Sequence, residues 1–198
     1  MNRVVPGFRP ELALAIAHHD DATRQILIAA VSDTGGGITV IGIAAEGATA
    51  HALVRRTAPD VALIEADLPG IDGLTVARAL THELPVCRVI LLGDATRAGA
   101  SYDTGAAGWL DRSCTAVDVM RAVRGVARRE SVPHATWATA VLATTDGDEL
   151  DPLDRAILEA VASGDDLDTV SRNLGLTRHL MGRRLDEALH RARVGGKG

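Results

Sequence analysis

Short apolar runs alternate with helix-like stretches along the first 128 residues of the chain. The helix-like stretches lie at 22–31, 48–56, 74–80 and 115–128, with one further short helix after residue 92. Strands that are apolar on both faces and alternate with helices predict a parallel sheet with helices on both sides. We therefore expect a doubly wound α/β domain over residues 10–128. The apolar runs, which have the length of buried strands, lie at 12–17, 38–44, 61–64, 89–92 and 107–110.

The pattern changes after residue 128. Residues 129–149 carry Pro, Thr, Asp and Gly, and we interpret them as a linker with a short helical stretch around Trp137. An all-helical pattern follows and predicts a small all-α domain over 150–194. The expected boundaries are Asp151 and Pro152 at the start of the first helix, Ser163 and Gly164 at its end, 167–174 for the second helix, and Thr177 and Arg178 as the cap and first residue of the third.

Composition and charge indicate the cellular compartment of the protein more clearly than its binding partner. The chain of 198 residues is 46% hydrophobic but only 2% aromatic, so its core is built from Ala, Val, Leu and Ile. A formal net charge of −5 excludes a chain that is basic throughout, but not a local patch that binds nucleic acid. Cys87 and Cys114 lack metal-ligand spacing, and no apolar run suits a signal peptide or a membrane span. We expect a cytoplasmic protein without membrane contact.

Two segments resemble the receiver domain of bacterial response regulators. Residues 59–80 combine an apolar strand with the turn PGIDG at 69–73, which is similar to the turn after the phosphate-accepting Asp of that family. Residues 105–112 (GAAGWLDR) are similar to the fifth strand of the family, which leads to an essential Lys. The similarity extends from about Leu12 to Arg128. It implies a flavodoxin-like (βα)5 receiver domain, with another flavodoxin-like domain as the alternative.

The resemblance also implies a chemistry that this chain has lost. In the family, an acidic pair after the first strand holds magnesium, an Asp accepts the phosphoryl group, and a hydroxyl and a Lys bind its oxygens. The matching positions hold His18-His19 or His19-Asp20 for the acidic pair, Glu65 for the accepting Asp, Gly93 for the hydroxyl and Arg112 for the Lys. These departures from the family predict a pseudo-receiver that does not accept phosphate.

The two histidines have two explanations. His18 and His19 are more simply explained as solvated residues at a strand end than as metal ligands. The alternative is a transition metal held by His18, His19, Asp20 and Glu65, because imidazole suits zinc or copper. Nothing in the sequence requires this metal, and we expect no metal and no cofactor.

The charged residues on the neighbouring loops also have structural explanations. Asp67 and Asp72 fit turn residues better than ligands. For Glu65 we expect an ion pair with Arg112, because a carboxylate at a strand end needs a partner and a guanidinium group offers forked donors. Such a fixed pair would replace the phosphorylation switch.

Residues 150–189 resemble the DNA-binding domain of NarL/LuxR-type regulators. The resemblance holds without gaps through the first helix, the scaffold helix, the turn and the core of the recognition helix. From Thr177 to the end, six basic residues stand against two acidic ones, so positive charge gathers where a helix would enter a major groove. The matching residues are Leu150, Pro152, Ile157, Leu158, Val161, Gly164, Val170, Leu174, Gly175, Leu176, Thr177, Met181 and Leu185.

The expected recognition helix divides into a buried and an exposed side. Helical spacing places His179, Leu180 and Arg183 away from the buried stripe, with Arg184 at its flank. We expect Arg183 to contact a base, whereas Arg178 and Arg184 grip phosphates. The expected stripe is Met181, Leu185, Leu189 and Ala192, and the expected DNA-binding residues are Thr177, Arg178, His179, Arg183 and Arg184.

Two departures from the NarL/LuxR pattern weigh against DNA binding. Gly182 and Asp186 stand where the family often places basic residues. The fourth helix of the family, which assists dimerisation, is expected to be absent because the sequence closes with VGGKG. Dimerisation would then depend on the receiver-like domain or the linker.

Together these features predict an orphan, phosphorylation-independent transcription regulator. We expect it to bind double-stranded promoter DNA as a homodimer, or as a heterodimer with another regulator. The receiver-like domain would serve dimerisation or the sensing of a small-molecule ligand, as the resemblance to actinobacterial pseudo-receiver regulators implies. The alternative is a protein-interaction module that modulates another regulator by heterodimerisation without binding DNA. An enzyme is not expected, because no nucleophile–base arrangement or phosphate loop is visible.

Overall fold

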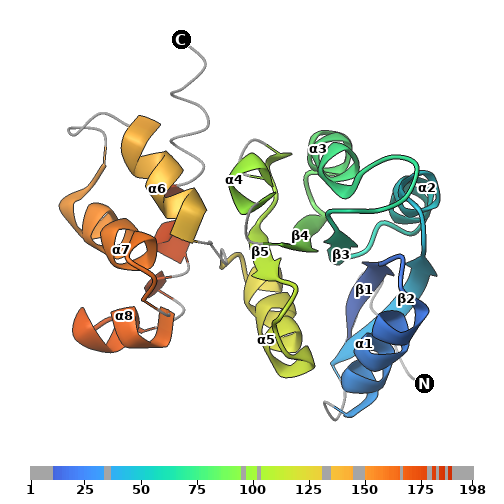
Figure 1. The fold of residues 1–198 in the computed structure, drawn as a ribbon. Helices are drawn as coiled ribbons and strands as arrows, with labels where there is room; N and C mark the ends of the chain where they lie inside the picture. The colour runs from blue at the N-terminus through green and yellow to red at the C-terminus, as the bar shows by residue number, and fades with distance from the viewer. Residues whose placement is uncertain are drawn as a thin grey trace, which may run out of the picture.

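The five expected strands form one parallel sheet in a computed structural model of the chain (Figure 1). The structure describes residues 11–33, 37–94, 97–101, 104–130, 135–144, 150–165, 167–177, 180–181, 183–185 and 187–188. The strand order is β2-β1-β3-β4-β5, which is the flavodoxin-like order and confirms the predicted fold class. The strands are β1 (Leu12–Ala17), β2 (Ile38–Ala44), β3 (Val61–Glu65), β4 (Arg88–Gly93) and β5 (Gly108–Asp111).

Each face of the sheet packs against its own layer of helices. Successive side chains of a strand point to opposite faces. In β1, Leu14 and Ile16 join one apolar core, while Ala15 and Ala17 join the other. Both faces of the strand are therefore buried, as its continuous apolar sequence predicts. The covering helices are α1 (Asp21–Asp33) and α5 (Ala116–Ala127) on one face, and α2 (Gly47–Thr57), α3 (Gly73–Glu83) and α4 (Ala98–Ser101) on the other.

In the described part of the chain, α6 (Ala135–Thr144), α7 (Pro152–Ala162) and α8 (Leu167–Asn173) follow the α/β domain. Helix α6 lies within the expected linker and is longer than the short stretch predicted there. Its residues Ala138 and Val141 are fully buried, because α6 packs on α7 and also contacts α4. Figure 1 shows α6 between α4 and α7, so the C-terminal helices adjoin the α/β domain. None of the helices in the described ranges has the length and apolar character needed to cross a bilayer.

Side-chain caps start the C-terminal helices where the sequence predicts them. The Asp151 carboxylate accepts a hydrogen bond from the Leu153 backbone N–H at 2.8 Å, and Pro152 occupies the first turn of α7. Thr177 caps the next helix, since the Leu180 N–H donates to Thr177 Oγ1 at 3.2 Å.

The described residues after Thr177 are helical at 180–181, 183–185 and 187–188. Met181 and Leu185 are buried in the core of the C-terminal helices, and Leu180 is exposed, as the expected stripe predicts. Leu189 and Ala192 lie outside the described residues.

Arg184 has an unexpected place in this packing. Its Nε donates to Asp154 Oδ1 at 2.6 Å, and its Nη2 donates to Asp151 Oδ1 at 2.8 Å. Asp154 is buried in α7, and its hydrogen bond raises the pKa of the Arg184 guanidinium. The charged pair therefore ties the third helix of this domain to α7. This structural role was not expected from the sequence, and the predicted contact of Arg184 with a DNA phosphate stays a prediction.

We predict that Arg184→Ala lowers the free energy of unfolding of the C-terminal helices by about 1–3 kcal/mol, because the buried Asp154 carboxylate loses a charged donor. Urea unfolding followed by circular dichroism measures the change. Arg183→Ala is the matched control. Its side chain is exposed and lies 3.5 Å from Glu187, so the expected change is below about 0.5 kcal/mol. Equal losses in the two variants would contradict the structural role of Arg184.

Candidate functional site

The carboxyl ends of four strands meet at one edge of the sheet. Strand β1 pairs with β3, β3 with β4, and β4 with β5, so the residues after these strands become neighbours. In doubly wound sheets, ligands bind at this edge. The residues there are His18 and His19 after β1, Glu65 at the end of β3, Gly93 at the end of β4 and Arg112 after β5.

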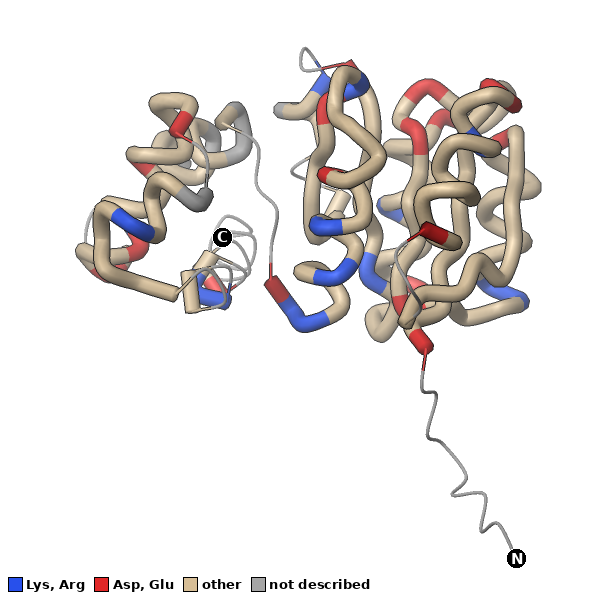
Figure 2. Tube along the Cα trace, turned by 90° about the horizontal axis from the view of Figure 1, so that it is seen from below, with Lys and Arg blue, Asp and Glu red and all other residues tan. Residues whose placement is uncertain are grey.

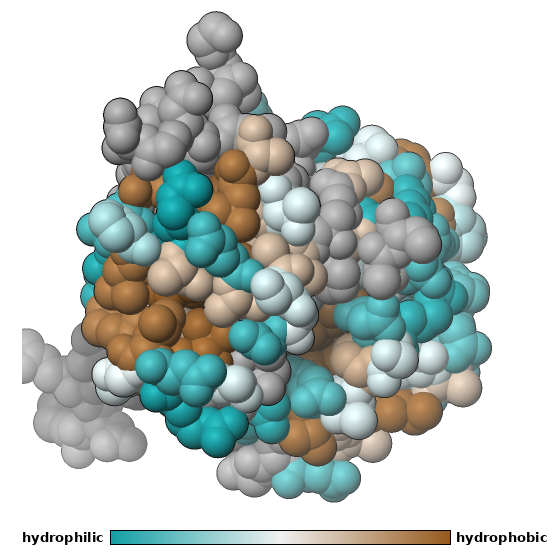
Figure 3. Space-filling view, turned by 60° about the vertical axis from the view of Figure 1, so that its left-hand side comes forward, coloured by the Kyte–Doolittle hydropathy of each residue, from teal (hydrophilic) through white to brown (hydrophobic). Residues whose placement is uncertain are grey.

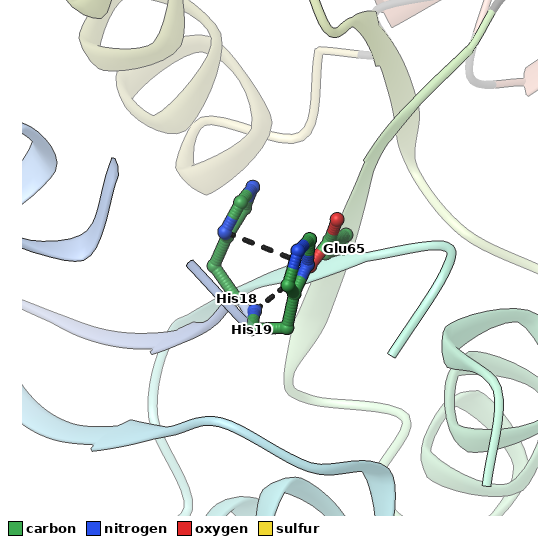
Figure 4. Close-up of side chains that lie close together, drawn as sticks. All are labelled: His18, His19 and Glu65. Atoms are coloured by element: carbon green, nitrogen blue, oxygen red, sulfur yellow. Dashed lines mark hydrogen bonds and ion pairs between the residues drawn. The ribbon is translucent and has the colours of Figure 1, made fainter. Parts of the chain in front are cut away.

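Glu65 is buried, with 1% of its surface exposed, and His19 is its main partner. The His19 backbone N–H donates to Glu65 Oε2 at 2.8 Å, and His19 Nδ1 lies 2.7 Å from the same oxygen. Figure 4 shows His18 and His19 beside the carboxylate. Gly73, at the start of α3, lies against the main chain of Glu65, where a Cβ would come within 1.9 Å of the Glu65 carbonyl oxygen. The side chain at the phosphate-accepting position is thus held by contacts within the protein.

The expected ion pair between Glu65 and Arg112 is present, but it is loose. Arg112 Nη2 lies 3.6 Å from Glu65 Oε1, whereas it donates a hydrogen bond to Asp67 Oδ2 at 3.0 Å. Arg97 also contacts Asp67, which therefore joins two arginines in addition to its expected place in the turn. Because the Arg112 side chain is 51% exposed, its pair with Glu65 contributes little to stability.

Two carboxylates beside the site cap helices. Thr23 donates to Asp20 Oδ2 from both its backbone N–H and its hydroxyl, each at 2.7 Å, and these bonds lower the pKa of Asp20. Asp72 accepts from the Thr75 N–H at 2.7 Å, which lowers the pKa of Asp72 and agrees with its expected role in the turn. Asp20 is not part of the cluster of ligating groups around Glu65, which corrects its place in the four-residue metal set considered above.

His18 is not solvated. Only 6% of its surface is exposed, so the expectation of a solvated strand end is wrong for His18, although it holds for the half-exposed His19. His18 Nδ1 accepts a hydrogen bond from the Asp20 N–H at 3.1 Å and lies 3.6 Å from Glu65 Oε2. Burial lowers the pKa of His18, against the opposing effect of the Glu65 charge, and so favours the neutral imidazole.

Trp109 fills the space beside Gly93, where the family places a hydroxyl. A Cβ on Gly93 would come within 2.9 Å of the Trp109 indole and 3.0 Å of Ala66 Cβ. Trp109 is itself buried in the sheet core. A side chain at Gly93 would therefore collide with the indole, so the packing around this position excludes a residue that carries a hydroxyl.

The recognition helix is described only in part. Arg183 has an exposed side chain, and its Nη2 lies 3.5 Å from Glu187 Oε1, one turn further along the chain. Thr177 acts as a helix cap. The expected DNA contacts Arg178 and His179 lie outside the described residues, as do Gly182 and Asp186.

A cavity of about 530 Å³ lies between α1 and α5, away from the Glu65 cluster. Three arginines of α5 and its C-terminal end line it, together with Asp33 of α1 and apolar residues such as Met120. Figure 2 shows several basic positions along the chain in the middle of the view. The charge of the lining suits an anionic group. The arginines are Arg121, Arg124 and Arg128.

We predict that Gly93→Ala lowers the free energy of unfolding by about 1–3 kcal/mol, because the new methyl group overpacks the contact with Trp109. Urea unfolding of Gly93→Ala in the wild-type background and in a Trp109→Phe background measures the coupling between the two positions. The smaller ring should reduce the cost of the added methyl group. An equal cost in both backgrounds would show that the indole does not occupy this space.

Known proteins resemble this chain in sequence, above all over the α/β domain. Residues 14–124 match the family model of the response regulator receiver domain. The chain is 35% identical over 113 residues to "Probable transcriptional regulatory protein NarL" of Mycobacterium tuberculosis, covering 55% of this chain and 51% of that protein. It is 26% identical over 187 residues to the transcriptional regulatory protein AfsQ1 of Streptomyces coelicolor, covering 92% of this chain and 76% of AfsQ1. The chain spans about half the length of NarL and of most curated relatives that it matches.

Solved structures show the same architecture. The signal receiver domain of M. tuberculosis NarL superimposes with a TM-score of 0.56 at 30% identity, covering 61% of this chain and 98% of that domain. The RcsB response regulator of Salmonella typhimurium covers 93% of both chains with a TM-score of 0.58, and at 13% identity it supports the fold alone. The chain therefore belongs to the response regulator receiver domain family, with NarL-type transcription regulators among its relatives.

Proposed function

We propose that the protein is a DNA-binding transcription regulator that works without phosphorylation. One observation carries the proposal: the carboxylate at the phosphate-accepting position is buried and already bonded to His19. The neighbouring hydroxyl position, Gly93, lies against Trp109 and Ala66. At the positions that match the family, a pseudo-receiver of this kind offers neither the acidic pair that holds magnesium nor the hydroxyl that binds a phosphoryl oxygen.

Double-stranded promoter DNA is the partner that the C-terminal helices fit best. Their core, with Met181 and Leu185 buried and Arg183 exposed, supports a recognition helix whose basic side faces outward. NarL and AfsQ1 are named as transcriptional regulatory proteins, which supports the same role here. Their hosts, Mycobacterium and Streptomyces, support an actinobacterial type of regulator. We place its action in the cytoplasm, as a homodimer or a heterodimer with another regulator.

The receiver-like domain would serve dimerisation or ligand sensing. The cavity between α1 and α5 supports ligand sensing, because Arg121, Arg124 and Arg128 surround an opening large enough for a small anionic molecule. In this proposal a ligand takes over the regulatory role that phosphate has lost.

A protein-interaction module that binds another regulator without binding DNA is the second candidate. The hydrogen bonds of Arg184 to Asp151 and Asp154 favour it, because a guanidinium group held by two carboxylates is less available to a DNA phosphate. Figure 3 shows apolar surface gathered on the C-terminal helices, which also suits a protein partner.

We predict that acetyl phosphate with Mg²⁺ leaves the protein unmodified, because the Glu65 site lacks a hydroxyl and an acidic pair. Intact-mass measurement detects a phosphoryl adduct directly. Glu65→Asp should also stay unmodified, since His18, His19 and Gly93 remain in place. A stoichiometric adduct on the wild-type receiver-like domain would overturn the pseudo-receiver proposal.

We predict that Arg183→Ala weakens binding to a specific promoter fragment by roughly 1–3 kcal/mol, because an exposed arginine pairs with guanine in the major groove. Gel-shift titration with footprinted genomic fragments measures the change. Arg56→Ala, an exposed arginine of α2 in the receiver-like domain, removes the same charge and should leave the affinity unchanged. If the protein binds no fragment, the interaction module becomes the better account. If Arg183→Ala binds as tightly as the wild type, the recognition helix is misassigned.

A further inference from the structure

Two imidazoles and one carboxylate converge at the carboxyl edge of the sheet, from His18, His19 and Glu65 (Figure 4). One ligating atom of each residue lies within 4.8 Å of those of the other two. We propose that these three side chains form a binding site for a divalent transition metal of the zinc class. The proposal goes beyond the proposed function, which needs no metal.

The strongest sign of a missing ligand is a buried oxygen of Glu65. Oε2 is bonded twice by His19, but Oε1 has no hydrogen-bond partner among the described residues. A buried carboxylate oxygen without a partner is costly, and such groups normally meet a donor, a water or an ion. Arg112 Nη2 lies 3.6 Å from Oε1, beyond hydrogen-bond distance, so a metal ion beside Glu65 would give this oxygen a closer positive partner.

Both histidines are arranged to ligate from the same side. Their rings stack with centroids 5.3 Å apart and planes inclined by 14°. His18 Nδ1 accepts a hydrogen bond from the Asp20 N–H, so this nitrogen carries no proton, and a metal would bind it by displacing that hydrogen bond. His18 Nδ1 lies 3.6 Å from Glu65 Oε2. That distance is close to the separation of about 3.3 Å between two ligand atoms of a tetrahedral zinc ion with bonds near 2.0 Å.

His19 can bind the metal if the metal replaces the proton that now lies between its Nδ1 and Glu65. Its Nδ1 lies 2.7 Å from Glu65 Oε2, which places a proton between the two atoms. The metal takes the place of this proton, the ring remains a neutral imidazole with its proton on Nε2, and the two atoms then separate by about half an ångström to reach the spacing of zinc ligands. Because the His19 side chain is half exposed, it has room for this movement.

The loop that carries both histidines is held by Arg24. Its Nη1 donates to the carbonyl oxygens of His18 at 2.7 Å and of His19 at 2.8 Å. Asp20 fixes the following residues by capping α1 through Thr23. Ligands that are held by a second layer of contacts lose little freedom on binding, which favours metal affinity.

The ligand set selects the metal. Two imidazoles and one carboxylate with an open fourth position match zinc sites that hold three protein ligands. Magnesium prefers oxygen ligands in octahedral geometry, and the cluster offers oxygen from one residue only. Arg112, the nearest cation, is half exposed and bonded to Asp67, so it can remain on Asp67 while the metal binds Glu65.

Isothermal titration of the metal-free full chain with ZnCl₂ tests the proposal, with MgCl₂ as the comparison. We expect one equivalent of Zn²⁺ to bind, and Mg²⁺ to bind at least tenfold more weakly. His19→Gln and Glu65→Gln should each weaken Zn²⁺ binding by about tenfold or more. The half-exposed position of His19 makes His19→Gln safe for folding, so this variant decides the test if Glu65→Gln is unstable.

His82→Gln is the matched control, because His82 is an exposed histidine of α3 outside the cluster. It should bind Zn²⁺ as the wild type does. The proposal is overturned if the chain does not bind Zn²⁺, if Mg²⁺ binds as tightly, or if His19→Gln retains the wild-type affinity. The titration contains no DNA, so its failure would leave the proposed function standing.

Discussion

A carboxylate that is almost out of contact with water lies at the end of β3, and the edge of the sheet is organised around it. Burial of a charge is costly unless hydrogen bonds and opposite charges compensate. For Glu65 the compensation comes from the backbone and side chain of His19, and more loosely from Arg112. Gly73 lets the next helix start directly against the Glu65 main chain. These contacts hold the site in one arrangement without any phosphoryl group.

The fold could be predicted from the sequence, because a strand that is buried on both faces is a continuous apolar run. The five apolar runs became the five strands, and the positions of Glu65, Gly93 and Arg112 at one edge followed from the parallel order. The partners at that edge were harder to predict, because they depend on side-chain direction. The neighbouring positions of β1 and β3 in the sheet were the available signal for the contact between His19 and Glu65.

Packing accounts for two further features that the sequence did not reveal. Gly93 stands where the family places a hydroxyl, and Trp109 on the neighbouring strand β5 fills the space that a side chain at this position would need. Arg184 lies at the flank of the predicted stripe, and its role depends on Asp151 and Asp154, which lie one turn apart at the start of α7. Asp151 and Asp154 thus stabilise the helical segment after Thr177 through Arg184.

Genome-wide occupancy of the tagged protein in its own cells tests the central claim most directly. The account predicts discrete occupied sites at promoters, with a shared sequence motif, in cells where mass spectrometry finds no phosphoryl group on the receiver-like domain. Occupancy no greater than that of an untagged control would contradict DNA binding. Occupancy that appears only together with phosphorylated protein would contradict the claim that the site acts without phosphate.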